Sequence, residues 1–292
     1  MATARVRCHA GTAGRSVGPV VDFQSLHGPR RCPQHDGGQG QQPENGARRG
    51  WRRGRRHQHA DQHRGAGIGG GGSFVLDDRE EWEKTFAVCW SGVYYGSRAF
   101  VPLLIASSEG HLINTSSVNG FWASLGPASA HTAYSAAKFA VKGFTEALVN
   151  DFRLNAPHVK VSLVMPGHIG TSIVINSGKI LGRDPKQMSE EDVARARTQL
   201  ARLGMDASGA TDDEIRHGMQ MLAENFRDNA PMTAAEAASV ILDGVRNETW
   251  RILVGDDAVG LDKLVREDPE GAYEQAFMDR LQSEAGWAVG LG

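Results

Sequence analysis

The chain has 292 residues, which is enough for one large α/β domain, or two small ones, with a buried core. Its net charge of −2 argues against a nucleic-acid partner. Its three cysteines (Cys8, Cys32 and Cys89) form neither a disulfide framework nor a metal-ligand spacing. Sparse cysteines in odd number are typical of a reducing compartment, so we expect a cytoplasmic protein without a metal site. No apolar run or signal-peptide core predicts a membrane span.

The first 64 residues differ in composition from the rest. They hold 12 arginines and no lysine against four acids, a balance of +8 that leaves −10 for residues 65–292. Six of the 11 histidines also lie there, with one leucine and no isoleucine. Such a segment buries too little apolar surface to offset the entropy of ordering it, so we expect it to be disordered.

After residue 65 the sequence shows the periodicities of a globular α/β protein. A helix is predicted to begin at the acids of "DDREEWEKTFAV" (77–88) and to continue through "SGVYYGSRAFVPLLIAS" (91–107), with a break near Cys89. "HLINTSS" (111–117) predicts a short apolar strand that ends in small polar residues. A second long helix follows over about 131–155.

The rest of the chain continues this alternation. "VKVSLVMPG" (159–167) predicts a buried strand, and "RILVG" (251–255) a last strand before a final helix within 268–282. Between them three helices have start signals, in which a Ser or Thr precedes an acid by three positions: Ser189 with Asp192, Thr211 with Glu214, and Thr233 with Glu236. Strands alternating with helices predict a parallel sheet.

Tyr134 and Lys138 share one face of the helix predicted over 131–155, because they lie four residues apart. A tyrosine hydroxyl has an unperturbed pKa of about 10, and a fixed ammonium nearby lowers it. The phenol would then exchange a proton near neutral pH, as general acid/base catalysis requires. The alternative interpretation is an ordinary tyrosine and lysine on a helix surface.

Two further motifs follow neighbouring strands. Ser117 follows the apolar part of the segment 111–117, at the edge of a parallel sheet where ligands gather. Its hydroxyl would donate a hydrogen bond to a carbonyl oxygen that gains negative charge. "PGHIGT" (166–171) forces a sharp exit from the next strand and offers the Thr171 hydroxyl to a nucleotide. The alternatives are a serine that caps a turn and an ordinary strand-to-helix loop.

In this order and spacing, "NTSSVNG" (114–120), "YSAAK" (134–138) and "PGHIGT" closely resemble the motifs of the short-chain dehydrogenase/reductase family. "GAGIGGGGSF" (65–74) resembles its Asn-Asn-Ala-Gly strand end, and the likeness covers about residues 65–255. The resemblance implies a Rossmann-type doubly wound parallel sheet that binds NAD or NADP. It also implies an oxidoreductase that moves hydride between the nicotinamide and an alcohol or carbonyl substrate.

The same resemblance assigns the catalytic roles. Tyr134 would be the acid/base that acts on the substrate oxygen. Lys138 would lower the pKa of Tyr134 and hold the nicotinamide ribose, so both residues also belong to the cofactor site. Ser117 would orient and polarise the substrate carbonyl.

The remaining cofactor contacts follow from the resemblance too. Gly67 would let the backbone approach the cofactor. Ile169 (through its backbone) and Thr171 would hold the carboxamide, and Gly167 belongs to the same cofactor site. The family commonly pairs its two long helices across a dimer face, here about 86–107 and 131–155, which predicts a homodimer or homotetramer.

The sequence departs from the family pattern in three places. Cys89 stands where the family often has an asparagine that completes a proton relay, and a thiol cannot replace an amide in hydrogen bonding. Arg64 and Gly65 replace the asparagines of the strand-end motif. The family's opening strand and glycine-rich turn are missing, since the glycines of "GTAGRSVG" (11–18) are wrongly spaced.

We therefore expect residues 1–64 to be missing from the sheet or disordered. One hypothesis is that they are translated out of frame from a GC-rich gene, because the family likeness starts abruptly at Ala66. A basic arm that binds nucleic acid or an acidic surface is the rival hypothesis.

Residues 65–292 form the predicted catalytic domain, with a helical insert at about 172–232 that covers the substrate. The apolar residues of this insert would line a pocket for a bulky apolar alcohol or ketone: Leu181, Met188, Leu200, Leu203, Met205, Met219, Met221 and Leu222. The alternative is that they form the cores of amphipathic helices. Trp122 is a further candidate for substrate contact. The alternative to an active oxidoreductase is an inactive relative that cannot bind dinucleotide and acts as an oligomerising or scaffold protein.

Overall fold

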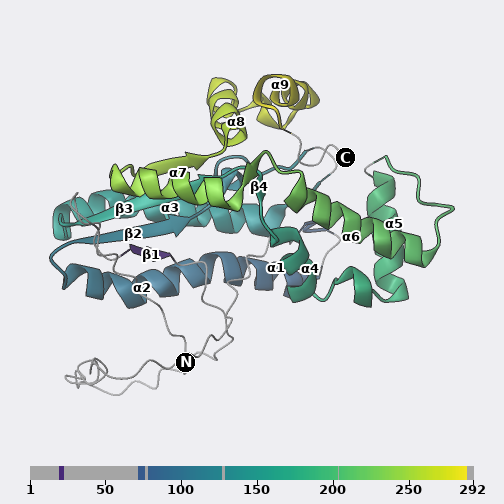
Figure 1. Cartoon of the computed structure of the whole chain (residues 1–292), viewed down its shortest axis with the longest axis horizontal. Helices are drawn as coiled ribbons and strands as arrows, with labels where there is room; N and C mark the ends of the chain where they lie inside the picture. Colours follow the sequence, from purple (N-terminus) through teal and green to yellow (C-terminus); the bar gives the residue numbers. More distant parts are fainter. Residues whose placement is uncertain (1–19, 23–71, 76–77, 127–128, 203, 288–292) are drawn as a thin grey trace, which may run out of the picture.

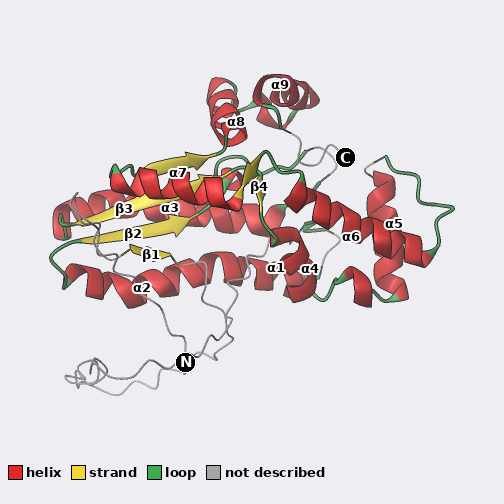
Figure 2. Ribbon diagram, in the orientation of Figure 1, coloured by secondary structure: helices red, strands yellow, loops and turns green. Residues whose placement is uncertain are grey.

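The computed structural model describes residues 20–22, 72–75, 78–126, 129–202 and 204–287. Their centre is a four-stranded parallel sheet in the order β1-β2-β3-β6. Its strands are β1 (Val20–Asp22), β2 (Gly110–Thr115), β3 (Val159–Pro166) and β6 (Arg251–Val254). Figures 1 and 2 show helices around this sheet, with α8 and α9 beyond β6 and the α4–α6 group at one end.

Alternate residues of β3 face opposite layers of helices, as the period of a strand requires. Leu163 and Met165 pack with Val93 of α2 (Gly92–Ile105) and Val141 of α3 (Thr132–Asn155). Val164, between them, packs in a different cluster that includes residues of α7 (Ala234–Arg246). Because both faces are covered, the sheet is doubly wound, as predicted.

The first long helix is irregular near Cys89, as predicted, but it is not broken there. α1 (Arg79–Phe86) passes into a π-helical segment, Ala87–Ser91, and α2 continues from it. Cys89 is the middle residue of this segment and is buried. A π-helical turn of this kind often occurs at a functional site.

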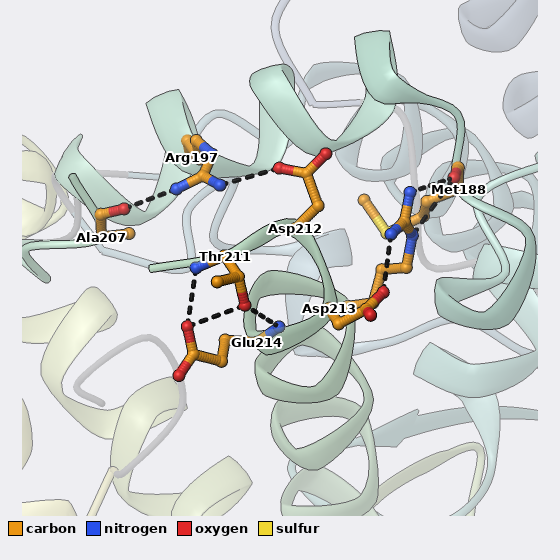
Figure 3. Close-up of polar contacts among 8 residues, drawn as sticks. Met188, Arg197, Ala207, Thr211, Asp212, Asp213 and Glu214 are labelled. Carbon is orange, nitrogen blue, oxygen red and sulfur yellow. Dashed lines mark hydrogen bonds and ion pairs between the residues drawn. The ribbon is translucent and has the colours of Figure 1, made fainter. Parts of the chain in front are cut away.

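The three predicted helix starts are also confirmed. α5 (Glu190–Arg202) begins after Ser189, whose hydroxyl accepts a hydrogen bond from the Asp192 N–H. α6 (Asp212–Asp228) and α7 both begin with capping boxes, the first formed by Thr211 and Glu214 (Figure 3). Each box satisfies backbone N–H groups that have no partner within the helix.

Five elements were not predicted from the sequence. β1, from the first 64 residues, pairs in parallel with β2, and its three residues are too few for a periodic signal. The rest of residues 1–64 lies outside the described residues. The other four are α4 (Ile173–Ile180), α8 (Asp256–Glu267) and the two-residue strands β4 (Ile169–Gly170) and β5 (Met232–Thr233), which pair in parallel. The expected last helix is α9 (Gln275–Ala285).

The segment from α4 to α6 has its own hydrophobic core. Met188, Val193, Leu200 and Ile215 are buried there together, with Met205 and Met219 against them. Arg197 donates to the Ala207 carbonyl and to Asp212, as Figure 3 shows. Arg216 donates to the Met188 carbonyl, which joins α6 to the loop before α5. Four of the eight apolar residues predicted for a pocket therefore lie in or against this core, while Met221 and Leu222 are exposed. Leu203 lies outside the described residues.

The expectation that Trp122 contacts substrate is wrong. Its side chain is fully buried in a cluster formed mainly by residues of α8 and α9, and its ring lies across that of Trp287. The indole N–H donates to the Ala272 carbonyl at 2.7 Å, so both the apolar body and the polar edge are satisfied within the core.

Every helix within the described ranges is too short or too polar to cross a lipid bilayer.

His111 makes the stability of the sheet depend on pH. Its buried Nε2 lies 2.8 Å from the Ser162 hydroxyl, which itself donates to the Thr249 carbonyl. Burial lowers the pKa of His111 to about 4, against an ordinary value of 6.5. The unfolded chain therefore binds more protons between these values, and this stabilisation is complete above pH 6.5 and lost as pH falls toward 4.

We expect the free energy of unfolding to fall by up to about 3 kcal/mol through this group between pH 7 and pH 4. His111→Gln removes the titrating ring, so its pH dependence should be flatter than that of the unmodified protein. Urea unfolding at several pH values measures this, with His217→Gln on an exposed site as the control. An equal slope in His111→Gln and the unmodified protein would contradict the assignment.

Candidate active site

The carboxyl ends of β2 and β3 meet at one edge of the sheet. Thr115, the last residue of β2, pairs in register with Val164, and the Ser116 N–H then donates to the Val164 carbonyl at 2.8 Å. Ser117 therefore leaves the sheet beside Pro166, where β3 also ends. In open parallel sheets this is the edge where ligands bind.

The loop after β2 is attached to α3 through Ser116. Its hydroxyl donates to the Lys138 carbonyl at 2.8 Å, in the middle of the helix. Ser117 is extended and nearly buried, and its hydroxyl accepts from the Asn119 N–H at 3.2 Å as the cap of a short 3₁₀ turn. The backbone at Gly120 lies against α3 so closely that a Cβ there would overlap the Ser116 hydroxyl.

Tyr134 and Lys138 lie on the face of α3 that is turned to this loop. Both are almost fully buried, with 8% and 4% of their surface exposed, which argues against an ordinary helix-surface pair. The Lys138 ammonium donates to the Thr115 carbonyl at 3.1 Å and lies 5.3 Å from the centre of the Tyr134 ring. The Ser117 hydroxyl is close enough to Tyr134 to lower the pKa of the phenol. The structure thus brings together the three residues predicted to be catalytic.

The pKa of Tyr134 lies above its ordinary value, contrary to the expectation of titration near neutral pH. Burial is the largest cause, and it outweighs the Lys138 charge and the nearby Ser117 hydroxyl, both of which lower the pKa. The phenol is therefore protonated at neutral pH in this structure. A buried, protonated phenol beside an ammonium is suited to donate a proton.

Two side chains surround the phenol ring. The His131 ring stacks on it, with centroids 4.7 Å apart and planes inclined by 19°. Cys89 packs with Tyr134 and Ala137, and the proximity of its thiol contributes to raising the pKa of Tyr134. The position where the family often has an asparagine is therefore occupied by a thiol in the same buried cluster as the candidate acid.

The loop after β3 is fixed from several sides. The Gly167 N–H donates to the Val254 carbonyl at 2.9 Å, and Ile169 is buried against β6 and α7. Ile169 and Gly170 form β4, and the Thr171 N–H returns to the Ile169 carbonyl. Gly167, Ile169 and Thr171 thus lie at the end of the strand adjacent to the serine loop. Gly67 lies outside the described residues.

The sequence patterns did not predict a role for Asp257. This nearly buried residue of α8 accepts a hydrogen bond from the His168 N–H at 2.6 Å, across 89 positions of the chain. The only local signal is the "GDDA" (255–258) that follows the last strand, where an acid at a helix start is common. Among the described residues, no cluster of His, Cys, Asp and Glu has the size needed to hold a metal ion.

Residues 63–180 match the sequence model of a family described as short chain dehydrogenase. A Mycobacterium tuberculosis protein (strain ATCC 25618 / H37Rv) named as an oxidoreductase, SadH, is 32% identical over 202 residues, which is 69% of this chain and 59% of that protein. An uncharacterized oxidoreductase of Staphylococcus aureus (strain MRSA252) is 32% identical over 117 residues, 40% of this chain and 47% of that protein. The chain thus spans less than two thirds of these relatives.

A solved structure shares the fold. The crystal structure of a short chain dehydrogenase/reductase from Burkholderia phymatum, in complex with NAD, matches with a TM-score of 0.51 and 24% sequence identity. The match covers 70% of this chain and 64% of that chain.

Two glycines near the site test how tightly the serine loop is held. Gly120→Ala should destabilise the protein by about 1–3 kcal/mol, because the added methyl group overlaps Ser116 and lies 2.9 Å from the Lys138 carbonyl. Gly143→Ala, in α3 and with nothing within 4 Å of its Cβ, should instead stabilise it by about 0.5–1 kcal/mol. Urea unfolding measures both, and equal effects of the two substitutions would contradict the close approach at Gly120.

Proposed function

The chain belongs to the short-chain dehydrogenase family, and we propose that it is an oxidoreductase that moves hydride between NAD or NADP and an alcohol or carbonyl carbon of a small substrate. The observation that carries this proposal is the buried cluster of Ser117, Tyr134 and Lys138 at the carboxyl edge of the sheet. A lysine and a tyrosine are seldom buried unless their polar groups have a task or a partner.

The described residues fit the nicotinamide half of such a cofactor. Lys138 has three N–H donors, and the described part of the chain supplies one acceptor for them, the Thr115 carbonyl. The remaining donors suit the hydroxyls of a ribose. Thr171 and the backbone of Ile169, at the adjacent strand end, would hold the carboxamide, and Gly167 gives the loop its close fit against the sheet.

Tyr134 would act as the general acid in carbonyl reduction. Its raised pKa keeps the phenol protonated, so it donates the proton to the substrate oxygen while the bound nicotinamide supplies the hydride. Lys138 lies close enough to stabilise the phenolate that remains, because an ammonium lowers the free energy of a nearby anion. Alcohol oxidation would use the same residues in reverse.

Ser117 would orient the substrate. Its hydroxyl is close enough to Tyr134 to lower the pKa of the phenol, so a carbonyl oxygen placed between the two hydroxyls would receive two donors. The Asn119 N–H donates to the Ser117 oxygen, which leaves the hydroxyl hydrogen available for the substrate.

The insert favours a bulky apolar alcohol or ketone as substrate. Val174 of α4 and Met221 and Leu222 of α6 are exposed, on helices that lie together at the end of the molecule where the α4–α6 group is found (Figure 1). Exposed apolar side chains of this kind commonly contact a ligand or partner.

The chain would act as a homodimer or homotetramer through α2 and α3. Both helices expose large apolar side chains: Tyr94, Tyr95, Leu103, Ile105, Phe139 and Leu154. A second copy that covered this face would remove them from water.

Fluorescence titration of the full-length chain with NADH and NADPH tests the proposed function first. We expect saturable binding of at least one of them. No binding up to about 1 mM would contradict the oxidoreductase and favour the inactive, oligomerising relative.

Tyr134→Phe tests the catalytic assignment. It should lower kcat/KM for ketone reduction by about 100-fold or more, because it removes the proton donor, while the dissociation constant for NADH changes little. Tyr95→Phe, on the exposed face of α2, is the matched control. Retention of activity in Tyr134→Phe would sink the assignment.

A further inference from the structure

His168 and Asp257 hold the loop after β3 from two sides, and neither belongs to the catalytic cluster. We propose that they are positioning residues that tie the loop of residues 167–171 to α6, so that binding of the nicotinamide cofactor orders the α4–α6 group over the substrate. This inference rests on the proposed function for its ligand, and on the contacts around His168 for its mechanism.

Asp257 provides the first side of the attachment. One carboxylate oxygen accepts from the His168 N–H at 2.6 Å, and the other accepts from the Ala258 N–H at 2.9 Å at the start of α8. Burial raises the pKa of Asp257, whereas these backbone donors lower it. The carboxylate therefore joins α8 to the loop through the His168 N–H, while the Ala258 N–H holds its orientation at the start of α8, in a site with little access to water.

Two glycines make room for that carboxylate. A Cβ on Gly167 would overlap both Asp257 carboxylate oxygens, and a Cβ on Gly255 would overlap one of them. Gly255 also has a φ of 107°, which residues with a side chain rarely adopt. Glycine thus follows directly after both β3 and β6 where Asp257 lies, which indicates that the position of the carboxylate is closely specified.

His168 provides the second side. Its Nε2 lies 2.7 Å from the Phe226 carbonyl near the end of α6, and its ring packs on the Phe226 ring with centroids 4.2 Å apart. Since a carbonyl oxygen only accepts, Nε2 must carry the proton and donate it. His168 is 8% exposed, so this bond is shielded from competing water.

The backbone reinforces the same connection. A Cβ on Gly170 would lie 2.7 Å from the Arg227 carbonyl, which means that the loop touches the last turn of α6 directly. Gly170 also pairs with Thr233, just after α6. Loop and helix end therefore form one packed unit, with Asp257 beneath it and Phe226 beside it.

A cofactor held by the backbone of Ile169 and by Thr171 would restrict the motion of this unit. The bond from His168 to the Phe226 carbonyl would then restrict the motion of α6 as well. α6 carries the exposed apolar residues proposed to contact the substrate. Substrate and cofactor would then bind with positive coupling, because each ligand orders a segment of the chain that the other ligand contacts.

Amide hydrogen exchange of the full-length chain, without ligand, tests the attachment itself. His168→Phe keeps a ring beside Phe226 but has no donor, whereas His168→Gln keeps an N–H near the position of Nε2. Asp257→Asn keeps the shape but can accept only one of the two bonds. We expect His168→Phe and Asp257→Asn to speed exchange about tenfold or more in residues 168–171 and 223–228, and His168→Gln to change it little.

Two matched controls remove similar bonds elsewhere. Asp262→Asn, also in α8, weakens a pairing with Arg251, and His158→Phe removes the ring nitrogen that lies 3.0 Å from the Ile105 carbonyl. If His168→Phe speeds exchange no more than these controls, or affects the loop and leaves α6 unchanged, the inference is overturned. The pair His168→Phe and His168→Gln decides the matter even if Asp257→Asn does not fold.

Titration with NADH and NADPH then tests the coupling. In the unmodified protein, the nucleotide that binds should slow exchange in residues 223–228, and in His168→Phe it should not do so even at saturation. The dissociation constant should rise about tenfold in His168→Phe and stay near the unmodified value in His168→Gln. Binding without any change in α6 overturns this inference alone. No binding of either nucleotide to the unmodified protein overturns the proposed function together with the coupling.

Discussion

The burial of one ammonium group organises the site. Lys138 is 4% exposed, and a charge in that position is tolerated only where acceptors and an electron-rich ring surround it. The Thr115 carbonyl at the end of β2 and the Tyr134 ring on the same helix meet that need. The carbonyl of Lys138 in turn binds the Ser116 hydroxyl, so the residue that needs a partner also fixes the loop that carries Ser117.

The second constraint is that the backbone of the loops must approach neighbouring elements closely, and a glycine stands at each of these contacts. Gly120 lets the serine loop touch α3, and Gly167 and Gly255 leave space for the Asp257 carboxylate. Such contacts transmit position from one element to another with little freedom, because atoms at van der Waals distance cannot move independently. The site is therefore set by the packing of the sheet and helices rather than by its own loops.

Local signals in the sequence predict much of this arrangement. Capping boxes mark the starts of α6 and α7, and the alternation of apolar runs with Gly and Pro marks β2, β3 and β6. The spacing of Tyr134 and Lys138 places them on one helical face. Parallel strand order then brings Ser117 to the same edge, which is why three residues separated in the chain could be predicted to meet.

The features that the sequence does not predict depend on contacts between residues far apart in the chain. Asp257 meets His168 across 89 positions, and no local pattern predicts which acid at a helix start will accept a bond from a distant loop. The direction of the Tyr134 pKa shift was not predicted either. The spacing shows that a lysine is near, but it does not show the burial whose effect on the pKa outweighs that of the lysine. The apolar residues of the insert suit a pocket or a core equally, and only packing distinguishes them.

The insert is a compact unit attached at its two ends. Its own core of Met188, Leu200 and neighbouring residues contains no residue of the sheet. Near its beginning, Lys84 of α1 donates to the Ile180 carbonyl, and near its end the His168–Phe226 contact joins α6 to the loop after β3. A unit with its own core and few attachments moves as a body, so the bonds at its ends determine where it lies. One of those ends is the loop proposed to hold the nicotinamide, which places control of the substrate cover within the cofactor site.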